Sequence, residues 1–160
     1  MGVIVKVIRH KNADLSYLWN ACRYGRDREI ARGAYGVHPQ DPESEYAQMV
    51  AARKYYNQTS TNPLIHLVVS FDGMTDNAIF AIKAAPKIAA YFKSSYQVLW
   101  SVHPADPESS HFHVHIMLNT VNLRNGKLFH SGPYEINGFA YHVKWITGMS
   151  YQICFECKED

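Results

Sequence analysis

The chain has 160 residues, 47% of them hydrophobic and 19% charged, with a formal net charge of +2 at pH 7. This length and composition exclude a disordered chain and predict one domain over residues 1–160. No apolar run reaches the roughly 18 residues of a membrane span, and the three cysteines lack regular spacing. We therefore expect a cytoplasmic protein with reduced thiols and no membrane partner.

Basic residues are concentrated near the start of the chain. Residues 1–32 hold seven Lys and Arg against three acidic residues, whereas the other 128 residues hold nine basic and eleven acidic ones. This asymmetry indicates a local anion-binding site rather than a surface that attracts polyanions everywhere.

Strand and helix patterns alternate along the chain. Runs of β-branched residues predict strands, while Asn12 or Asp14, and then Asp41, are the capping residues at which two helices should begin. Pro86 should kink or split its helix, and Asn125-Gly126 predicts a hairpin turn. The expected extended segments are 3–9, 34–38, 64–71, 96–102, 112–123, 127–129 and 150–155, and the expected helices are 14–24, 41–56, 75–93 and 138–146. This order predicts an α+β fold with a central antiparallel or mixed β-sheet and flanking helices.

The most informative segment runs from His111 to Asn119. Side chains of a strand alternate between its two faces, so this segment should have one apolar and one polar face. The apolar side chains are Phe112, Val114, Ile116 and Leu118, and those of the other face are His111, His113, His115 and Asn119. Imidazoles two positions apart lie about 6–7 Å from each other, close enough to converge on one metal ion. A lone histidine would be an ordinary hydrogen-bonded residue, but this alternation favours a metal site.

A third imidazole should come from His103, which ends the strand expected over 96–102. Three imidazoles can hold Zn²⁺ with an open fourth position, and Mn²⁺ or Mg²⁺ also fit when a phosphate supplies oxygen ligands. We expect Mg²⁺ or Mn²⁺, with Zn²⁺ as the alternative. Cys154 and Cys157 should point to opposite faces of a strand, so they are not expected to bind a metal together.

The segment His113-Val114-His115, with His103 before it and Ile-Met-Leu-Asn after it, resembles the metal motif of HUH-type relaxases. These are the mobilization nucleases of the MobA/VirD2-like group. Tyr35-Gly36-Val37 and Asp41-Pro42-Glu43 are similar to the region before that family's second helix. The likeness is densest over residues 103–129.

This resemblance implies an HUH-type relaxase fold and site- and strand-specific DNA nicking at an origin of transfer of a mobile element, such as a plasmid in conjugation. A tyrosine oxygen would attack the phosphate, leaving a 5′-phosphotyrosine and a free 3′-hydroxyl, while a divalent metal polarises the scissile phosphate. The implied partners are single-stranded DNA and accessory mobilization proteins. The implied metal ligands are His103, His113 and His115. Asp106 and Glu108 are expected to act as a base or to orient a histidine, His111 to support the ligands or contact DNA, and Asn119 to support the ligands.

The family places its nucleophilic tyrosine on or just after the first helix, where Tyr24 matches best and Tyr17 is the rival. Both lie opposite the apolar stripe of that helix, about 20° apart at 100° per residue, so both should be free to meet a substrate. Arginines beside Tyr24 suit phosphate binding. The expected DNA-binding residues are Arg23, Arg26, Arg28, Arg32 and Lys127.

Other functions are compatible with the same histidine pattern. Rolling-circle replication initiators share the histidine pattern, and a second tyrosine three or four residues from the first would favour some of them. A non-catalytic module on the same scaffold would bind DNA or metal without forming a covalent adduct. A zinc hydrolase would act without any dependence on tyrosine.

Overall fold

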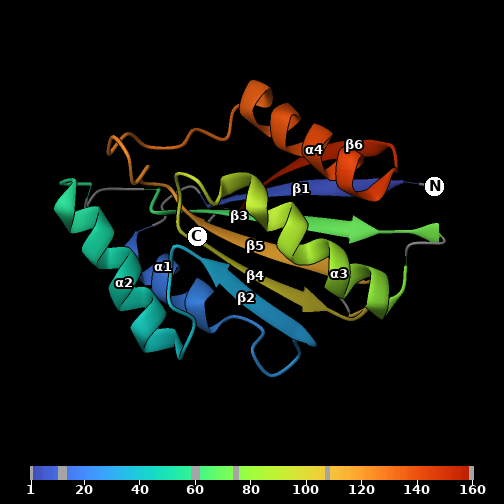
Figure 1. Cartoon of the computed structure of the whole chain (residues 1–160), viewed down its shortest axis with the longest axis horizontal. Coiled ribbons are helices and arrows are strands. Elements are labelled where there is room, and N and C mark those ends of the chain that lie inside the picture. The colour runs from blue at the N-terminus through green and yellow to red at the C-terminus, as the bar shows by residue number, and fades with distance from the viewer. Residues whose placement is uncertain (1, 11–13, 59–61, 74–75, 107–108, 159–160) are drawn as a thin grey trace.

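The computed structural model describes residues 2–10, 14–58, 62–73, 76–106 and 109–158, and Figure 1 shows its elements. The strands are β1 (Val3–His10), β2 (Ala31–Tyr35), β3 (Leu64–Phe71), β4 (Val98–His103), β5 (His113–Asn119) and β6 (Tyr151–Lys158). The helices are α1 (Leu15–Arg23), α2 (Pro42–Tyr55), α3 (Ala78–Ala89), α4 (Pro133–Thr147) and the short 3-10 helix η2 (Ala90–Phe92). None of the described helices is long and apolar enough to cross a membrane.

The strands form one six-stranded sheet in the order β2-β4-β5-β3-β1-β6. β6 pairs with β1 in parallel, and the other four pairings are antiparallel. The predicted α+β architecture with a mixed central sheet is therefore confirmed.

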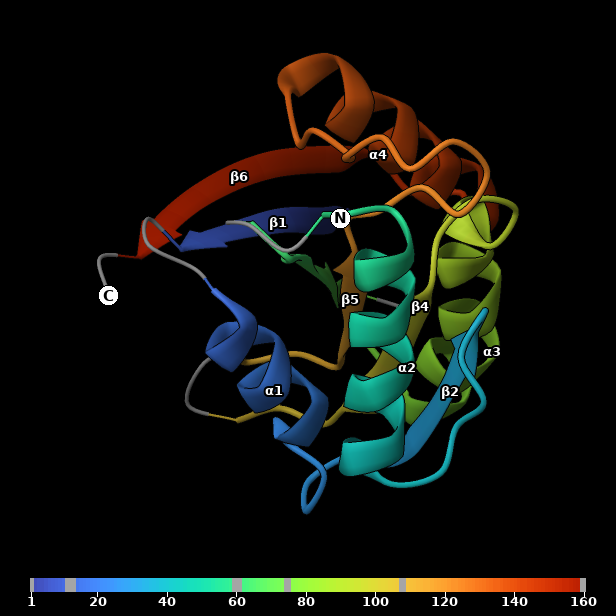
Figure 2. The ribbon, with the colours of Figure 1, turned by 90° about the vertical axis from the view of Figure 1, so that its left-hand side faces the viewer.

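Helices lie on both sides of the sheet (Figure 2). α3 and α4 lie on one side, over the main core, which includes the predicted apolar face of β5. α1 and α2 lie on the other side, where Leu18 and Met49 share a smaller cluster with Leu99 of β4 and Met117 of β5. Among the described residues, β1 and β6 contribute nothing to this smaller cluster, so their side chains on that side remain available to line a groove.

Capping residues begin the first two helices as predicted. Asp14 accepts a hydrogen bond from the backbone N–H of Ser16. Asp41 accepts one from Ser44, and Pro42 occupies the first turn of α2. Short polar side chains in these positions satisfy N–H groups that the helix itself leaves without partners.

Two predictions about helices were wrong. α4 begins at Pro133, five residues before the predicted start, because Pro133 follows Gly132 as a preorganised first residue. Pro86 does not split its helix, since α3 continues through Pro86 to Ala89 and then tightens into η2. The predicted start of this helix at Thr75 lies outside the described residues, and α3 is capped by Asn77.

Two predictions about extended segments also need correction. β2 lies at Ala31–Tyr35 rather than 34–38, because its pairing with β4 begins at Ala31, opposite Val102. The turn at Asn125-Gly126 forms, with Gly126 at φ +74°. The segment after this turn, however, forms a single bridge between Val121 and Leu128 rather than the expected strand 127–129.

Candidate active site

Two neighbouring strands bring the three predicted metal ligands together. In the antiparallel pairing of β4 and β5, His103 lies opposite His113 and Ser101 lies opposite His115. The three histidines are at most 2% exposed. Each offers one ligand atom within 4.8 Å of the others, so the group could hold a metal ion.

Hydrogen bonds of Nδ1 orient the imidazoles of His113 and His115. Nδ1 of His113 donates to the backbone carbonyl of His111 at 2.8 Å, and Nδ1 of His115 lies 2.7 Å from Nε2 of His66. The Nε2 atoms of His113 and His115 are buried and make no hydrogen bond within the part of the chain that the structure describes. Buried nitrogens that are oriented through the other ring atom are typical of metal ligands.

His66 is a member of the site that the sequence analysis missed. It lies on β3, and burial, reinforced by nearby positive charge, lowers its pKa to about 3. Burial lowers the pKa of His115 as well, with His66 as the next cause. If His115 presents Nε2 to a metal, its Nδ1 must carry the ring proton and donate a hydrogen bond to Nε2 of His66. The sequence did contain a signal for this residue, because His66 is the one titratable side chain in the mainly apolar expected strand 64–71.

Two carboxylates flank the histidines. Asp106, predicted to act near the metal, lies with one oxygen 3.6 Å from Nε2 of His113 and 3.9 Å from Arg28. Asp76, which the sequence analysis did not single out, accepts from the backbone N–H of Phe112 and bonds Nδ1 of His111 at 2.9 Å. The contact with His111 lowers the pKa of Asp76. His111 thus reaches the site through its carbonyl, while its ring is held by Asp76.

Tyr24 ends α1, and its ring lies over the histidine cluster. The ring centroid is 5.2 Å from that of His115 and 6.1 Å from that of His103, on which it stacks. Gly25 follows with φ +67°, and a Cβ there would lie 2.3 Å from Cε1 of His103. The end of α1 therefore presses against a predicted metal ligand at a position that only glycine fits.

Arg28 is the cation next to this tyrosine. Its guanidinium carbon lies 5.3 Å from the centroid of the Tyr24 ring. A hydrogen bond with Tyr24 is the main reason that the pKa of Arg28 is raised. A positive charge in this position favours the ionised form of the phenol.

The prediction that both tyrosines stand free on the far side of α1 was wrong, since both pack partly against the smaller cluster. The ring of Tyr17 lies on that of His10, with centroids 4.0 Å apart. The structure thus places Tyr24 at the histidines and Tyr17 against the end of β1. This arrangement favours Tyr24 as the reactive residue.

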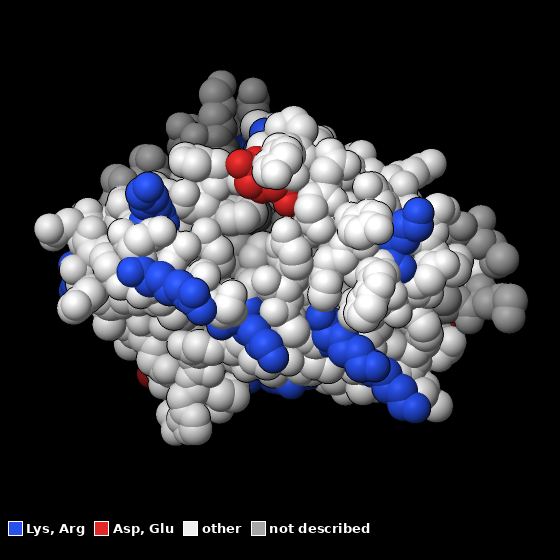
Figure 3. All heavy atoms as spheres, turned by 45° about the horizontal axis from the view of Figure 1, so that its top comes forward, with Lys and Arg blue, Asp and Glu red and all other residues white. Residues whose placement is uncertain are grey.

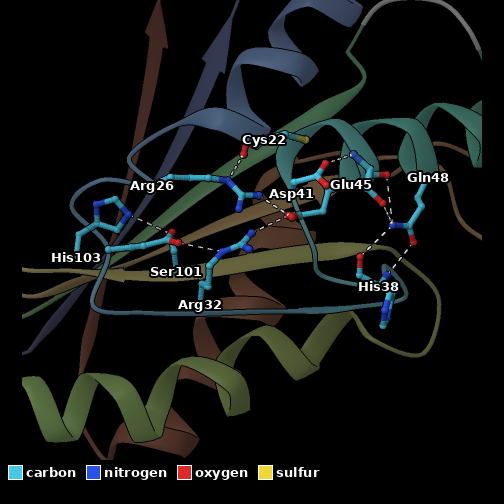
Figure 4. A network of polar contacts seen from close by, with 11 residues as sticks. Cys22, Arg26, Arg32, His38, Asp41, Glu45, Gln48, Ser101 and His103 are labelled. Carbon is cyan, nitrogen blue, oxygen red and sulfur yellow. Dashed lines mark hydrogen bonds and ion pairs between the residues drawn. The ribbon is translucent and has the colours of Figure 1, made fainter.

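A buried ion-pair network involves two of the arginines predicted to bind DNA (Figure 4). Glu45 of α2 is completely buried and pairs with Arg26 at 2.6 Å and with Arg32 at 2.7 Å. Arg26 also donates to the carbonyl of Cys22. These bonds tie the loop after Tyr24 and the strand β2 to α2, so both arginines already have an anionic partner within the chain. Their contacts with DNA remain predictions.

The other predicted DNA-binding residues have different surroundings. Arg23 is exposed and stacks its guanidinium over Trp19 at 5.3 Å. Lys127 is exposed in the turn after β5, where the neighbouring Gly126 packs against Tyr56 at the end of α2. Arg28 is the predicted DNA-binding residue that the structure places beside Tyr24.

Asn119 belongs to a buried network rather than to the histidine cluster. Its amide donates to the carbonyl of Met49 and to the side chain of Gln97, and its oxygen accepts from Arg53. These bonds fasten α2 to the end of β5, so the structure gives Asn119 a scaffolding role instead of the predicted contact with a metal ligand. Glu108, the other predicted base, lies outside the described residues.

A groove leads away from the histidines across the side of β1 and β6 that carries no part of the smaller cluster. This cavity of about 400 Å³ is bounded at one end by His113 and His115. Lys6 and Lys158 lie on its other walls, and Glu156 stands near both, 3.5 Å from Lys6 and 3.9 Å from Lys158. An extended anionic ligand whose reacting atom lay at the histidines would fit along it.

Comparison with known families agrees with this arrangement. The model of the family described as "Relaxase: MobA/VirD2-like, nuclease domain" matches residues 17–140, a segment that includes Tyr24 and the three histidines. A search of curated proteins found no match. The family match covers more than half of the chain, and the mixed sheet with its flanking helices is consistent with the fold of such domains. The chain therefore belongs to the MobA/VirD2-like relaxase family, as one of its DNA-nicking nuclease domains.

Proposed function

We propose that this chain cuts one DNA strand by attack of the phenolic oxygen of Tyr24 on a phosphodiester phosphorus. A P–O bond to Tyr24 forms and the P–O3′ bond breaks, so the products are a 5′-phosphotyrosine and a free 3′-hydroxyl. The observation that supports this best is the position of the Tyr24 ring against His115 and His103. Since the phosphotyrosine retains the bond energy, a 3′-hydroxyl can reverse the step without a nucleotide cofactor.

We assign the divalent metal to His103, His113 and His115. Two buried imidazole nitrogens without hydrogen bonds in the described chain support this assignment, as does the carboxylate of Asp106 at 3.6 Å from one of them. When bound, the ion would offset negative charge on the non-bridging oxygens of the scissile phosphate. Nitrogen and oxygen donors together suit Mn²⁺, whereas Mg²⁺ would depend more on the phosphate oxygens, and Zn²⁺ is the alternative.

Arg28 and Asp106 are proposed to help the phenol react. A tyrosine with a pKa near 10 is about one part in a thousand ionised at neutral pH, so the phenolate needs stabilisation. Arg28 bonds Tyr24 and supplies a positive charge as the phenolic proton leaves. Asp106, 3.9 Å from Arg28, is the proposed acceptor of that proton and can return it to the departing 3′-oxygen.

The groove along β1 and β6 is the proposed path of the single strand. It begins at His113 and His115, so a strand lying in it would place a phosphate next to the metal ligands. Lys6 and Lys158 would contact further phosphates, in competition with Glu156. We place this reaction at an origin of transfer of mobile DNA in the cytoplasm, together with accessory mobilization proteins.

A covalent-adduct assay tests this function. Single-stranded oligonucleotides from the DNA that adjoins the coding sequence are incubated with the protein in Mn²⁺ or in chelator, and denaturing gels reveal a shifted protein band. We expect a metal-dependent adduct that is lost in Tyr24→Phe and kept in the matched variant Tyr17→Phe. An adduct lost only in Tyr17→Phe would move the reaction to that residue. Metal and DNA binding without any adduct would instead identify a non-catalytic module.

A second reactive tyrosine would favour some replication initiators. Tyr55 and Tyr56 are adjacent at the end of α2, with rings in edge contact, and the hydroxyl of Tyr56 donates to the carbonyl of Leu123. A hydroxyl engaged in this way favours a packing role for Tyr56. The single-tyrosine reaction is therefore the one that we propose.

A further inference from the structure

Three exposed aromatic side chains lie on the solvent face of α4, across the sheet from the histidines. Tyr134, Tyr141 and Trp145 are 87%, 63% and 77% exposed. Spacings of seven and four residues place them within about 20° of a single line along the helix. The buried residues of α4 lie on its opposite face and are Ile136, Phe139, Ala140 and Val143. A surface helix normally presents polar residues to water, so this stripe indicates a binding surface.

The stripe borders a cavity of about 530 Å³ between α4 and its neighbours. Its aromatic walls are Tyr91 of η2, Phe129, Tyr134, Tyr141 and Tyr151. At Gly138, within the stripe, a Cβ would lie 2.8 Å from the hydroxyl oxygen of Tyr91. The glycine thus lets Tyr91 approach the helix backbone and leaves several ring faces around one opening.

Basic side chains lie at several places on the face of the molecule that Figure 3 shows. Lys144 precedes Trp145 on α4. The backbone carbonyl of Lys87 on α3 accepts a hydrogen bond from His142, whose ring lies against that of Tyr91. Both lysines are exposed, and no ion pair involves them within the described ranges of the chain. Glu135 is the single acidic residue in the sequences of α3, η2 and α4. By contrast, the cations nearest the histidines are paired with carboxylates, as Glu45, Asp106 and Glu156 show.

We propose that the α4 face, defined as Tyr91, Tyr134, Tyr141 and Trp145 with Lys87 and Lys144 beside them, is a second binding surface, for single-stranded DNA. Bases would stack on the rings, and phosphates would contact the lysines. Unpaired lysines beside aromatic rings favour a polyanion over a neutral peptide, because a peptide would use the rings but not the charges. The choice of DNA rests on the proposed function. The surface would hold a part of the strand distant from the scissile phosphate.

Binding of fluorescein-labelled oligothymidylate to the full chain, followed by anisotropy in chelator, tests this inference. Chelator prevents the metal-dependent reaction, so the measurement is independent of nicking. We expect Tyr134→Ala and Trp145→Ala to weaken binding at least about fivefold each, as stacking residues do. Tyr55→Ala, which removes an equally exposed tyrosine from α2, should leave affinity unchanged. Lys87→Gln should reduce the slope of log affinity against log salt by about 0.7.

The fluorescence of Trp145 reports on the α4 face directly. Oligothymidylate should quench a component of tryptophan emission that is missing in Trp145→Phe. Unchanged affinity in the α4 variants, or quenching that Trp145→Phe retains, would overturn the inference. A shift from dimer to monomer in Trp145→Ala, with DNA affinity unchanged, would identify a protein interface and also refute it. If the wild-type chain forms no adduct, but the α4 variants bind DNA more weakly than wild type, the proposed function is refuted, whereas the inferred binding surface on α4 is supported.

Discussion

Replacing Gly25 by alanine should damage both the backbone after α1 and the metal site. Gly25 has φ +67°, and a Cβ would lie 2.3 Å from Cε1 of His103. Carbon atoms pack at about 3.5–4.0 Å, so the imidazole of His103 or the loop would have to move by more than about 1 Å. Such a shift is half of the roughly 2 Å that separates a metal from an imidazole nitrogen.

The expected cost has two parts that a control can separate. A left-handed backbone costs a non-glycine residue about 1–2 kcal/mol, and overpacking adds about 1–3 kcal/mol. Gly148 has a nearly identical φ of +71°, but nothing lies within 4 Å of its Cβ position. Gly148→Ala should therefore lose the backbone part alone, whereas Gly25→Ala should lose about 2–5 kcal/mol of unfolding free energy.

Urea denaturation in chelator, combined with calorimetric titration by Mn²⁺, would measure both effects. We expect Gly25→Ala to bind Mn²⁺ at least about tenfold more weakly than wild type, in the range seen when ligand orientation is lost. Gly148→Ala should bind it normally. If the two variants were equally stable and bound Mn²⁺ equally well, the close approach of Gly25 to His103 would be refuted.

Three further predictions follow from buried or paired charges. Glu45→Gln should lower the free energy of unfolding by about 3 kcal/mol because it leaves two arginines without their buried carboxylate, whereas Glu43→Gln, in the exposed first turn of α2, should cost almost nothing; equal urea midpoints would contradict this. His66 and His115 are neutral in the folded protein but titrate near 6.5 when unfolded. The metal-free protein should therefore lose up to about 1.4 kcal/mol per histidine for each pH unit below 6.5, and for His66 this loss continues to about pH 3. A flat profile of unfolding free energy between pH 7 and 5 would refute the assignment. Glu156→Gln should raise affinity for single-stranded DNA severalfold at low salt, since it removes the carboxylate beside two groove lysines; unchanged anisotropy titrations would argue against this path.

Local sequence patterns predicted most of the elements and the three histidines that could hold a metal ion. Alternation along 111–119 depends only on strand geometry, so it correctly separated the histidine face from the buried apolar face of β5. The helix starts at Asp14 and Asp41 were equally predictable, because a capping side chain bonds N–H groups a few residues away. The placement of His103 opposite His113 needed one long-range assumption, that the two strands are neighbours, and the structure bears it out.

The choice between the two tyrosines could not be made from helical periodicity. On a continuous helix, Tyr17 and Tyr24 would occupy almost the same angle. In the structure α1 ends at Arg23, and Tyr24 and Gly25 both lie against His103. The contact of His66 with His115 could not be predicted either, because it depends on β3 lying beside β5. The spacing of these residues along the chain does not predict how far apart their side chains lie in the fold.

The sequence by itself thus determined which residues can share a strand face, where helices begin and which histidines can converge on a metal, since each of these depends on neighbours a few positions apart. Only the tertiary structure decided that Glu45 takes up two arginines and that Tyr24 reaches the histidines. It also decided that the rings of α4 remain in water. These outcomes depend on strand order and on helices packing over distant strands, where burial and charge pairing join residues that are far apart in the chain.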